Sequence, residues 1–302
     1  MATYYMSPTG NDSTGTGTQA NPYLTVVKCI SVASANDTIY LLAGTYNSTH
    51  WPLASRPTVN FAINFVGAGV GQTIVDWTGE VLWDYYGFLN TTFSFSLTGI
   101  QFQNIASSRD AYYCTLQMAF MGGGLTINVI DCLFQNFNTG AAFAGNQLFG
   151  CGSTNTSLLT GVTINIIGTV FKNIATSVAY SESGMFSIGG TGNTFNFFKN
   201  VIYLETVGGG GAQYIFARQN GNSVLNIKDC IVYNNQGSSS PFLTGAGTGN
   251  TINFNNNDTY GTFSALPTGA GNITTNPLFV DIPSNNFHLQ ATSPCRNAGG
   301  II

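Results

Sequence analysis

Charged residues are scarce in this sequence. Only 7% of its 302 residues are Asp, Glu, Lys or Arg, against about 25% in an average soluble domain. With 8 basic and 12 acidic residues, the net charge is −4. The chain therefore lacks the basic footprint that nucleic acid and anionic membrane surfaces require, and we expect neither as a partner. Because 43% of the residues are hydrophobic, the scarcity of charge does not indicate disorder.

Long apolar runs are missing as well. No run approaches the roughly 20 residues of a membrane-spanning helix, so we expect no membrane insertion. Residues 1–5 lack the basic and apolar regions of a signal peptide. The chain is then cytoplasmic, made inside a host cell by a virus, or separated from a leader, and the sequence leaves these three open. We expect a virion or an extracellular, cell-surface location.

The cysteines show no metal-binding spacing. None forms a CxxC or a zinc-type pair, and no cluster of three acids offers the oxygen cage that Ca²⁺ requires, so we expect no metal and no cofactor. An even count would suit three disulfides. A chain of 302 residues buries a large core without such links, which favours free, buried cysteines. The six are Cys29, Cys114, Cys132, Cys151, Cys230 and Cys295.

What the sequence has in abundance is repetition. Five segments share an alternation of apolar residues with Thr and Asn, and they recur about every 30 residues, with a weaker copy at 93–102. Such alternation is typical of strands with one buried face. No single unit can bury its apolar row, whereas stacked units bury one continuous core. The five segments are 125–134, 162–171, 193–202, 223–232 and 250–259.

The repeats predict an all-β fold, a single parallel β-helix (solenoid). The apolar spacing of residues 23–35 predicts an N-terminal capping helix over the open end of the first coil, because an open end is an unpaired edge. Residues 37–46 predict the first strand. The chain would form one structural domain, with the cap and first strand in 1–46, the coils in 47–275 and a closing segment in 276–302.

Distinctive motifs stand at both ends of the chain, in residues 4–12, 20–25, 37–40 and 43–46 and in residues 276–281, 287–290 and 293–294. They resemble the N-terminal cap and the closing segment of right-handed β-helix proteins of the pectin-lyase-like superfamily. The resemblance implies a right-handed β-helix. It does not imply one activity, because the superfamily includes polysaccharide lyases and hydrolases, phage tailspikes, adhesins and structural proteins.

Candidate catalytic residues are few. Family lyases typically use a Lys or Arg base, often with Ca²⁺ held by several acids, whereas the basic residues here are dispersed. A hydrolase needs two carboxylates about 5–9.5 Å apart. Asp110 and Glu182 follow the main strand two coils apart, which strand stacking places about 10 Å apart. The simpler interpretation, which we favour, is that they are two exposed loop acids. Glu80 and Asp84 are a second candidate pair.

Aromatic and charged side chains gather in residues 77–86 and, one coil later, in residues 107–113. Aromatic faces with polar rims suit sugar rings, which have apolar faces and hydroxyl edges. The same side chains would also suit a cover for the core or a subunit contact, where Tyr, Trp and Arg are enriched. The candidate carbohydrate-binding residues are Trp77, Glu80, Trp83, Asp84, Tyr85, Tyr86, Arg109, Tyr112 and Tyr113.

The repeats also stack threonines and asparagines at fixed positions. If these side chains face outward, they form a flat, uncharged surface that could organise water, as in ice-binding solenoids, or pair with another subunit. If they face inward, they form asparagine ladders along the stack. Ordinary β-helix patterning is the third interpretation. The residues are Thr126, Asn128, Thr163, Asn165, Thr194, Asn196, Thr251 and Asn253.

Scarce titratable groups and a long regular stack favour a non-enzymatic role. We expect a structural or receptor- or glycan-facing β-helix protein, of the viral, phage-appendage or cell-surface kind. There are two alternatives. The first is a polysaccharide-degrading enzyme, for which the sequence favours a hydrolase over a calcium-dependent lyase. The second is an ice- or surface-binding solenoid. The expected partners are a cell-surface polysaccharide and the chain itself. If the protein comes from a phage, the resemblance implies a homotrimer.

Overall fold

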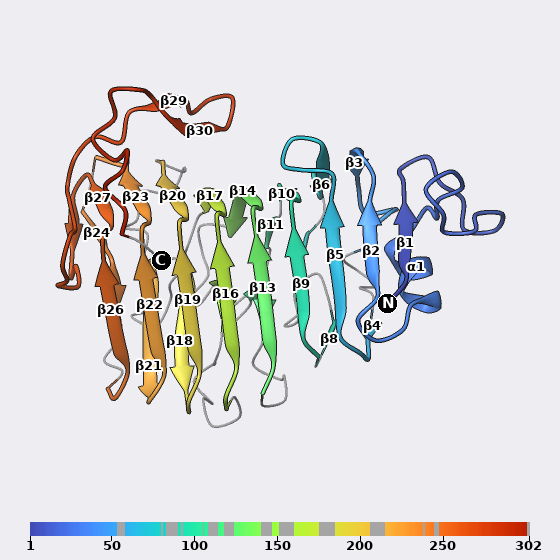
Figure 1. Cartoon of the computed structure of the whole chain (residues 1–302), viewed down its shortest axis with the longest axis horizontal. Helices are drawn as coiled ribbons and strands as arrows, with labels where there is room; N and C mark the ends of the chain where they lie inside the picture. The colour runs from blue at the N-terminus through green and yellow to red at the C-terminus, as the bar shows by residue number, and fades with distance from the viewer. Residues whose placement is uncertain are drawn as a thin grey trace.

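The protein is a right-handed parallel β-solenoid, here a computed structural model, with strands stacked coil upon coil in chain order (Figure 1). The one helix among the described residues, α1 (Val26–Val32), lies beside β1 at the N-terminal end. None of the described helical structure is long and apolar enough to cross a membrane. The structure describes residues 1–300 except 53–57, 80, 83–89, 92, 105, 108–113, 118–123, 140–146, 151–159, 175–184, 206–214, 238 and 245–247.

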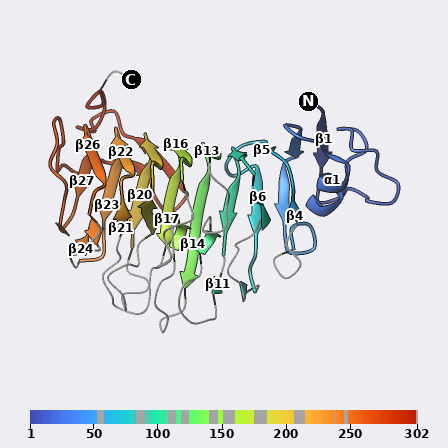
Figure 2. The same ribbon diagram turned by 90° about the horizontal axis from the view of Figure 1, so that it is seen from below.

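Three parallel sheets run along the molecule, and Figure 2 shows the first and second as separate layers. The first sheet comprises β1 (Thr3–Met6), β2 (Thr38–Leu41), β5 (Ile63–Gly67), β9 (Phe95–Thr98), β13 (Thr126–Ile130), β16 (Thr163–Ile167), β19 (Thr194–Phe198), β22 (Val224–Lys228) and β26 (Thr251–Asn255). The second comprises β3 (Gly44–Tyr46), β6 (Thr73–Asp76), β10 (Gln101–Gln103), β14 (Leu133–Thr139), β17 (Val170–Ile174), β20 (Val201–Leu204), β23 (Ile231–Asn234) and β27 (Asp258–Tyr260), with β7 (Val81–Leu82) and β11 (Ala106–Ser107) beside it.

The third sheet comprises β12 (Cys114–Gln117), β15 (Gln147–Gly150), β18 (Phe186–Gly190), β21 (Phe216–Gly221) and β25 (Leu243–Thr244). Two short parallel pairs, β4 (Thr58–Val59) with β8 (Asn90–Thr91) and β24 (Ser240–Pro241) with β28 (Phe263–Ser264), complete the coils. The pair β29 (Phe279–Asp281) and β30 (Asn286–Leu289) is antiparallel. It forms a hairpin that leaves the coils.

Each ten-residue repeat holds parts of two strands rather than one. Residues 126–130 form β13 in the first sheet, and the chain then turns through Asp131 and Cys132 into β14 of the second sheet. The first residue of this corner has a left-handed backbone, with φ of 50° at Asp131 and 56° at Lys199. Asp and Asn tolerate this conformation better than most residues do. The corner bends the apolar row around the core.

The second residue of each corner is buried and forms a column along the stack. In this column a side chain of one coil accepts a backbone hydrogen bond from the coil before it. The Thr169 N–H donates to Asn200 Oδ1 at 2.8 Å, and the Cys230 N–H donates to Asn257 Oδ1 at 3.0 Å. The column satisfies polar groups that no strand pairs. Its members are Ile100, Cys132, Thr169, Asn200, Cys230 and Asn257.

The predicted free, buried cysteines are confirmed at three positions. Cys29, Cys132 and Cys230 are buried and form no disulfide, and Cys295 is free and half-buried. Burial raises the pKa of the Cys132 thiol to about 12. A thiol this hard to ionise is chemically inert, so Cys132 serves packing.

The interior is one continuous apolar core that the inward faces of the strands fill. Phenylalanines stack along the axis, with ring centroids 5.1 Å apart for Phe102 and Phe134 and 5.5 Å apart for Phe134 and Phe171. All three side chains are fully buried. Offset-stacked rings of this kind stabilise a core beyond their burial.

The N-terminal cap is shorter than the sequence pattern predicts. Helix α1 covers residues 26–32 rather than 23–35, because Thr25 is its N-cap and accepts a hydrogen bond from the Lys28 N–H at 3.1 Å. Asp12 fixes that cap by accepting from the Thr25 hydroxyl at 2.7 Å. The predicted strand 37–46 is two strands, β2 and β3, which belong to different sheets. The proposed division at residues 46 and 275 stays a prediction.

Candidate functional site

Most residues of the predicted aromatic patch lie outside the described residues. The same holds for both members of the predicted catalytic pair. These positions stay predictions. They are Glu80, Trp83, Asp84, Tyr85, Tyr86, Arg109, Asp110, Tyr112, Tyr113 and Glu182.

The prediction that Trp77 contacts carbohydrate is wrong. Its side chain is 0% exposed, and its ring stacks on Phe102 at 5.9 Å. The indole N–H donates to the Trp51 carbonyl at 2.9 Å, so even its polar edge is occupied inside the protein. Trp77 covers the first coils of the core, which is the alternative that the sequence left open for these aromatics.

The Thr and Asn positions lie on the outer face of the first sheet. Asn165 Nδ2 donates to Asn128 Oδ1 at 2.8 Å, and Asn196 Nδ2 donates to Asn165 Oδ1 at 2.8 Å. The amide chain continues through Asn226 to Asn253 at 2.8 and 2.7 Å. Outward placement and bonding along the stack therefore occur together. Thr126, Thr251 and Asn253 are exposed, and Asn128, Thr163, Asn165, Thr194 and Asn196 are half-buried.

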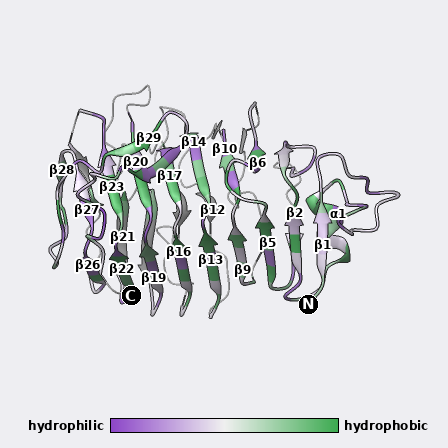
Figure 3. Cartoon of the chain, turned by 45° about the horizontal axis from the view of Figure 1, so that its top comes forward, coloured by the Kyte–Doolittle hydropathy of each residue, from purple (hydrophilic) through white to green (hydrophobic). Residues whose placement is uncertain are grey.

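The outer face of the second sheet is different, because the hairpin β29–β30 folds back over it (Figure 3). Lys172 of β17 is nearly buried, and its Nζ donates to the Ile282 carbonyl and to Asn285 Oδ1, both at 2.9 Å. Phe287 of the hairpin packs on Tyr203 of β20, with ring centroids 5.9 Å apart. Phe279 of the hairpin also stacks on Tyr233 of β23, with ring centroids 6.4 Å apart. One cation and two aromatic contacts thus hold the hairpin on the sheet.

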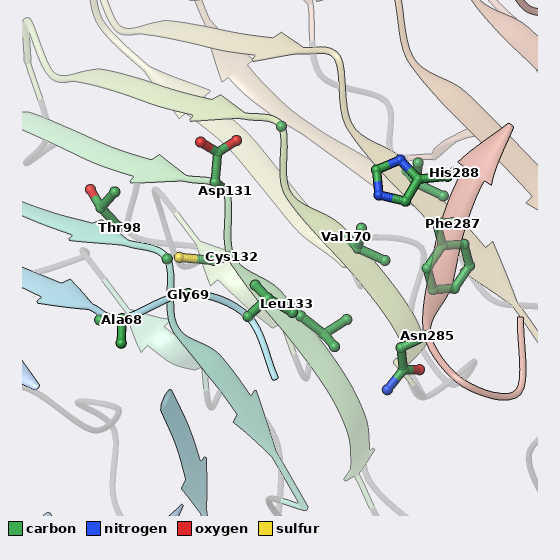
Figure 4. A pocket seen from close by; sticks show the side chains of 15 residues that line it. Ala68, Gly69, Thr98, Asp131, Cys132, Leu133, Val170, Asn285, Phe287 and His288 are labelled. Carbon is green, nitrogen blue, oxygen red and sulfur yellow. The ribbon is translucent and has the colours of Figure 1, made fainter. Parts of the chain in front are cut away.

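A groove of about 590 Å³ lies between this hairpin and the corners that join the first and second sheets (Figure 4). Leu133, Val170 and Val201 form its floor, on the outward side of the second sheet. Asp131 stands on one side of the groove, and Phe287 and His288 stand on the other. We call this cavity the closing groove. The sequence repeats gave no signal for it, since one of its walls is the non-repeating hairpin.

Small residues at the corners open the closing groove. Gly67, Gly69, Gly99 and Gly168 line it. Gly168 has a φ of 61°, and a Cβ placed there would overlap the Asp131 carboxylate. A larger residue at this corner would therefore displace the acid as well as strain the backbone.

Three polar side chains are available in the closing groove. Asp131 and His288 are exposed, and no hydrogen bond of their side-chain atoms to another described residue is present. Asn285 Oδ1 accepts a hydrogen bond from Lys172 Nζ, which leaves the Nδ2 of Asn285 as a donor toward the groove. An apolar floor with an aromatic wall and a few polar groups on the rim can bind a ligand that has both apolar faces and hydroxyl edges.

The described part of the chain offers no ready metal site. It contains no group of three His, Cys, Asp or Glu side chains that could hold an ion. Among the described residues that line the closing groove, Asp131 is the single carboxylate.

The fold and the repeated corners define a class, the parallel β-helix. Three solved structures are similar to this chain over most of its length. A rhamnogalacturonan lyase is 13% identical (TM-score 0.40, covering 97% of this chain and 96% of that one). Pectate lyase Pel9A is 14% identical (TM-score 0.37, 100% and 92%), and XylC in complex with xylose is 10% identical (TM-score 0.35, 87% and 69%).

The family is identified directly. A family model described as "Protein of unknown function (DUF1565)" matches residues 8–265, so the chain belongs to this family. The search of curated proteins found no match.

Proposed function

We propose that this chain is a non-enzymatic, glycan-facing β-helix protein that holds a polysaccharide in the closing groove. The observation that carries the proposal is the groove itself, which combines an apolar floor with a polar rim and runs along the stack. Sugar rings present apolar C–H faces and hydroxyl edges, which match that floor and that rim. Few charged side chains are needed for such binding.

The length of the closing groove favours a polymer over a single sugar. Its lining extends from the corner at Gly69, through those at Gly99, Asp131 and Gly168, to Val201 in the next coil. These five coils span four strand spacings, or about 19 Å. An extended chain of several sugar rings can lie along such a groove, parallel to the axis of the solenoid.

The chemistry of the closing groove favours binding over cleavage. Hydrolysis of a glycoside needs two carboxylates on either side of the bond, and Asp131 is the one carboxylate among the described lining residues. We therefore place the protein with structural or adhesive β-helices of a virion or cell surface, where the glycan would be a cell-surface polysaccharide. Self-assembly, as a homotrimer or otherwise, belongs to the same proposal.

The test combines binding with a search for cleavage. The purified protein is titrated calorimetrically with neutral and acidic polysaccharides, and polymer size and ultraviolet absorbance of unsaturated ends are followed. We expect binding without shortening. Val170→Glu places a bulky charge on the groove floor and should weaken binding at least about tenfold, which is about 1.4 kcal/mol. Val224→Glu, at an outward, half-buried position of the first sheet, is the matched control and should bind normally.

Two results would contradict this function. If the Val170→Glu variant binds polysaccharide as tightly as the wild type, the closing groove is not the binding site. Shortening of any polymer would establish the alternative, a polysaccharide-degrading enzyme. Amide variants of Asp110 and Glu182 would then test the predicted catalytic pair.

The outward asparagine chain favours a second candidate, a surface- or ice-binding solenoid. Its amides are aligned at the strand spacing, and threonines flank them on an almost uncharged face. Regular, weakly charged faces can order water or match a repeating surface. If so, the wild type should show thermal hysteresis, and Thr163→Tyr should abolish it whereas Val170→Glu should not. Hysteresis that survives Thr163→Tyr would end this candidate.

A further inference from the structure

Three tyrosines form a column on the outer face of the second sheet, in its last three strands. Tyr203, Tyr233 and Tyr260 occupy the same register position of β20, β23 and β27. Their rings meet edge to face, with centroids 5.1 Å apart for the first pair and 5.0 Å apart for the second. Such packing holds the rings in fixed orientations.

The hairpin packs on the first two tyrosines of this column, and Tyr260 is the one without a ring contact to the hairpin among the described residues. Phe287 packs on Tyr203, which is only 4% exposed, and Phe279 stacks on Tyr233 with ring centroids 6.4 Å apart. Tyr233 and Tyr260 are half-buried. A groove of about 530 Å³ lies beside these contacts. Tyr233 and Tyr260 line it together with Asn235 and Thr274. We call it the tyrosine groove. It lies beyond the contact of Phe287 with Tyr203, on the side away from the closing groove.

The polar groups of the tyrosine groove are suited to hydroxyls. Asn235 is exposed, and its Nδ2 donates to the Tyr203 hydroxyl at 3.0 Å, which leaves its Oδ1 as an acceptor. Thr274 is exposed and adds a hydroxyl that both donates and accepts. A ligand in this groove would meet aromatic rings, an amide oxygen and hydroxyl groups.

The surroundings of the tyrosine groove disfavour a negatively charged ligand. None of its described lining residues is Lys, Arg or His. Glu205 lies close by, since its backbone carbonyl accepts from Gln236 Nε2 at 3.0 Å. Burial first, and then the Glu205 charge, raises the pKa of Tyr203 to about 12, which places that carboxyl beside the column. A uronic acid would be repelled here.

We infer that the tyrosine groove is a second saccharide-binding site and that it takes an uncharged sugar ring against the face of Tyr260, beside Tyr233. The inference rests on the proposed glycan-facing function. It specifies the chemical class of the ligand, which is a neutral rather than an acidic glycan.

The test is calorimetric titration with three probes: mannohexaose, cellohexaose and an oligogalacturonate of the same length. We expect the wild type to bind one of the neutral probes and not the acidic one. Tyr260→Ala should weaken that binding about three- to tenfold, the value of one aromatic contact. Tyr260→Phe keeps the ring and should keep the affinity. Tyr40→Ala removes an outward, half-buried tyrosine of the first sheet and is the matched control.

The outcomes separate the inference from the proposed function. If Val170→Glu weakens binding while Tyr260→Ala binds like the wild type, the tyrosine groove is not a site and the closing groove stands. Preferential binding of the oligogalacturonate would overturn the neutral class. If the wild type binds no saccharide at all, both the inference and the proposed function fail. Equal loss in Tyr260→Phe and Tyr260→Ala would overturn the stacking account.

Discussion

The outer faces of the first and second sheets come from the same repeats, yet they differ in chemistry. The first carries asparagines hydrogen-bonded to one another in every successive pair from Asn128 to Asn253. The second changes along its length, and Gln135, Lys172 and Tyr203 occupy one register position in successive coils. Inward positions must repeat because the core is continuous. Outward positions can carry different residues from coil to coil, and in the second sheet they do.

This difference bears on recognition. In the first sheet, the asparagine amides hydrogen-bond to their neighbours in the adjacent coils. The face is therefore regular and presents the same groups in each of these coils. In the second sheet, divergence creates a docking point for the hairpin at Lys172 and an aromatic column beginning at Tyr203. The hairpin forms one wall of the closing groove, and the aromatic column lines the tyrosine groove. A selective glycan site is therefore expected on the second sheet.

The largest expected effect is the release of the hairpin by Lys172→Met. The variant leaves the Ile282 carbonyl and Asn285 Oδ1 without their charged donor. Hydrogen bonds to charged groups contribute about 1.5–3 kcal/mol, and we expect a loss of that size in the free energy of unfolding. Urea denaturation measures it, and limited proteolysis should cut the hairpin first. Lys199→Met, at an exposed corner, should change stability by less than about 0.5 kcal/mol.

Equal stability of the Lys172→Met and Lys199→Met variants would show that the aromatic contacts alone hold the hairpin. The cover that distinguishes the outer face of the second sheet from that of the first would then not depend on Lys172. Glycan affinity should fall in the Lys172→Met variant only, because the hairpin forms a wall of the closing groove.

A smaller effect is expected for two acids on the second sheet, Asp76 and Asp258, whose contributions to the free energy of unfolding should change with pH in opposite directions. Burial opposes the charge of Asp76, but hydrogen bonds from Thr78, Asn104 and Gln103 outweigh it and lower its pKa. The stability that Asp76 contributes is thus present above its ordinary pKa of 3.8 and is lost as the pH falls. Asp76→Asn should cost about 1 kcal/mol at neutral pH and less in acid.

Asp258 should behave in the opposite way. It is 3% exposed, and burial raises its pKa despite hydrogen bonds from Cys295 and from the Thr275 N–H. Its protonated form is therefore favoured in the folded state, and its contribution is lost as the pH rises through the folded pKa. Asp258→Asn should stabilise the protein at neutral pH by about 1 kcal/mol or less. Unfolding curves across pH test both variants, and the same sign for the two would contradict this account.

The smallest expected effect lies in the first sheet. Asn165→Ala removes two half-buried amide hydrogen bonds and should cost about 0.5–1 kcal/mol. Thr163→Ala, two residues earlier on the same strand, should cost less than about 0.5 kcal/mol. Neither variant should alter glycan affinity. A glycan defect in the Asn165→Ala variant would move the site to the first sheet.

Much of the fold could be predicted from the sequence, because repetition and alternation report inward positions directly. The corners could not, since Asp131 and Cys132 look like a continuing strand until the positive φ of Asp131 is known. The hairpin could not either, because Lys172 meets a partner 110 residues later in a segment that does not repeat. Trp77 shows a third limit. Composition alone does not tell whether an aromatic residue covers the core or faces a ligand.

The central claim, that the second sheet and not the first is the glycan-binding face, can be tested by hydroxyl-radical footprinting with the neutral hexasaccharide that binds most tightly. Oxidation of each side chain is compared with and without the sugar. The account predicts protection of Phe287 and His288 at the closing groove and of Tyr260 at the tyrosine groove, with Tyr40 and Phe198 of the first sheet unchanged. Protection of Tyr40 and Phe198 without protection of the other three would contradict it.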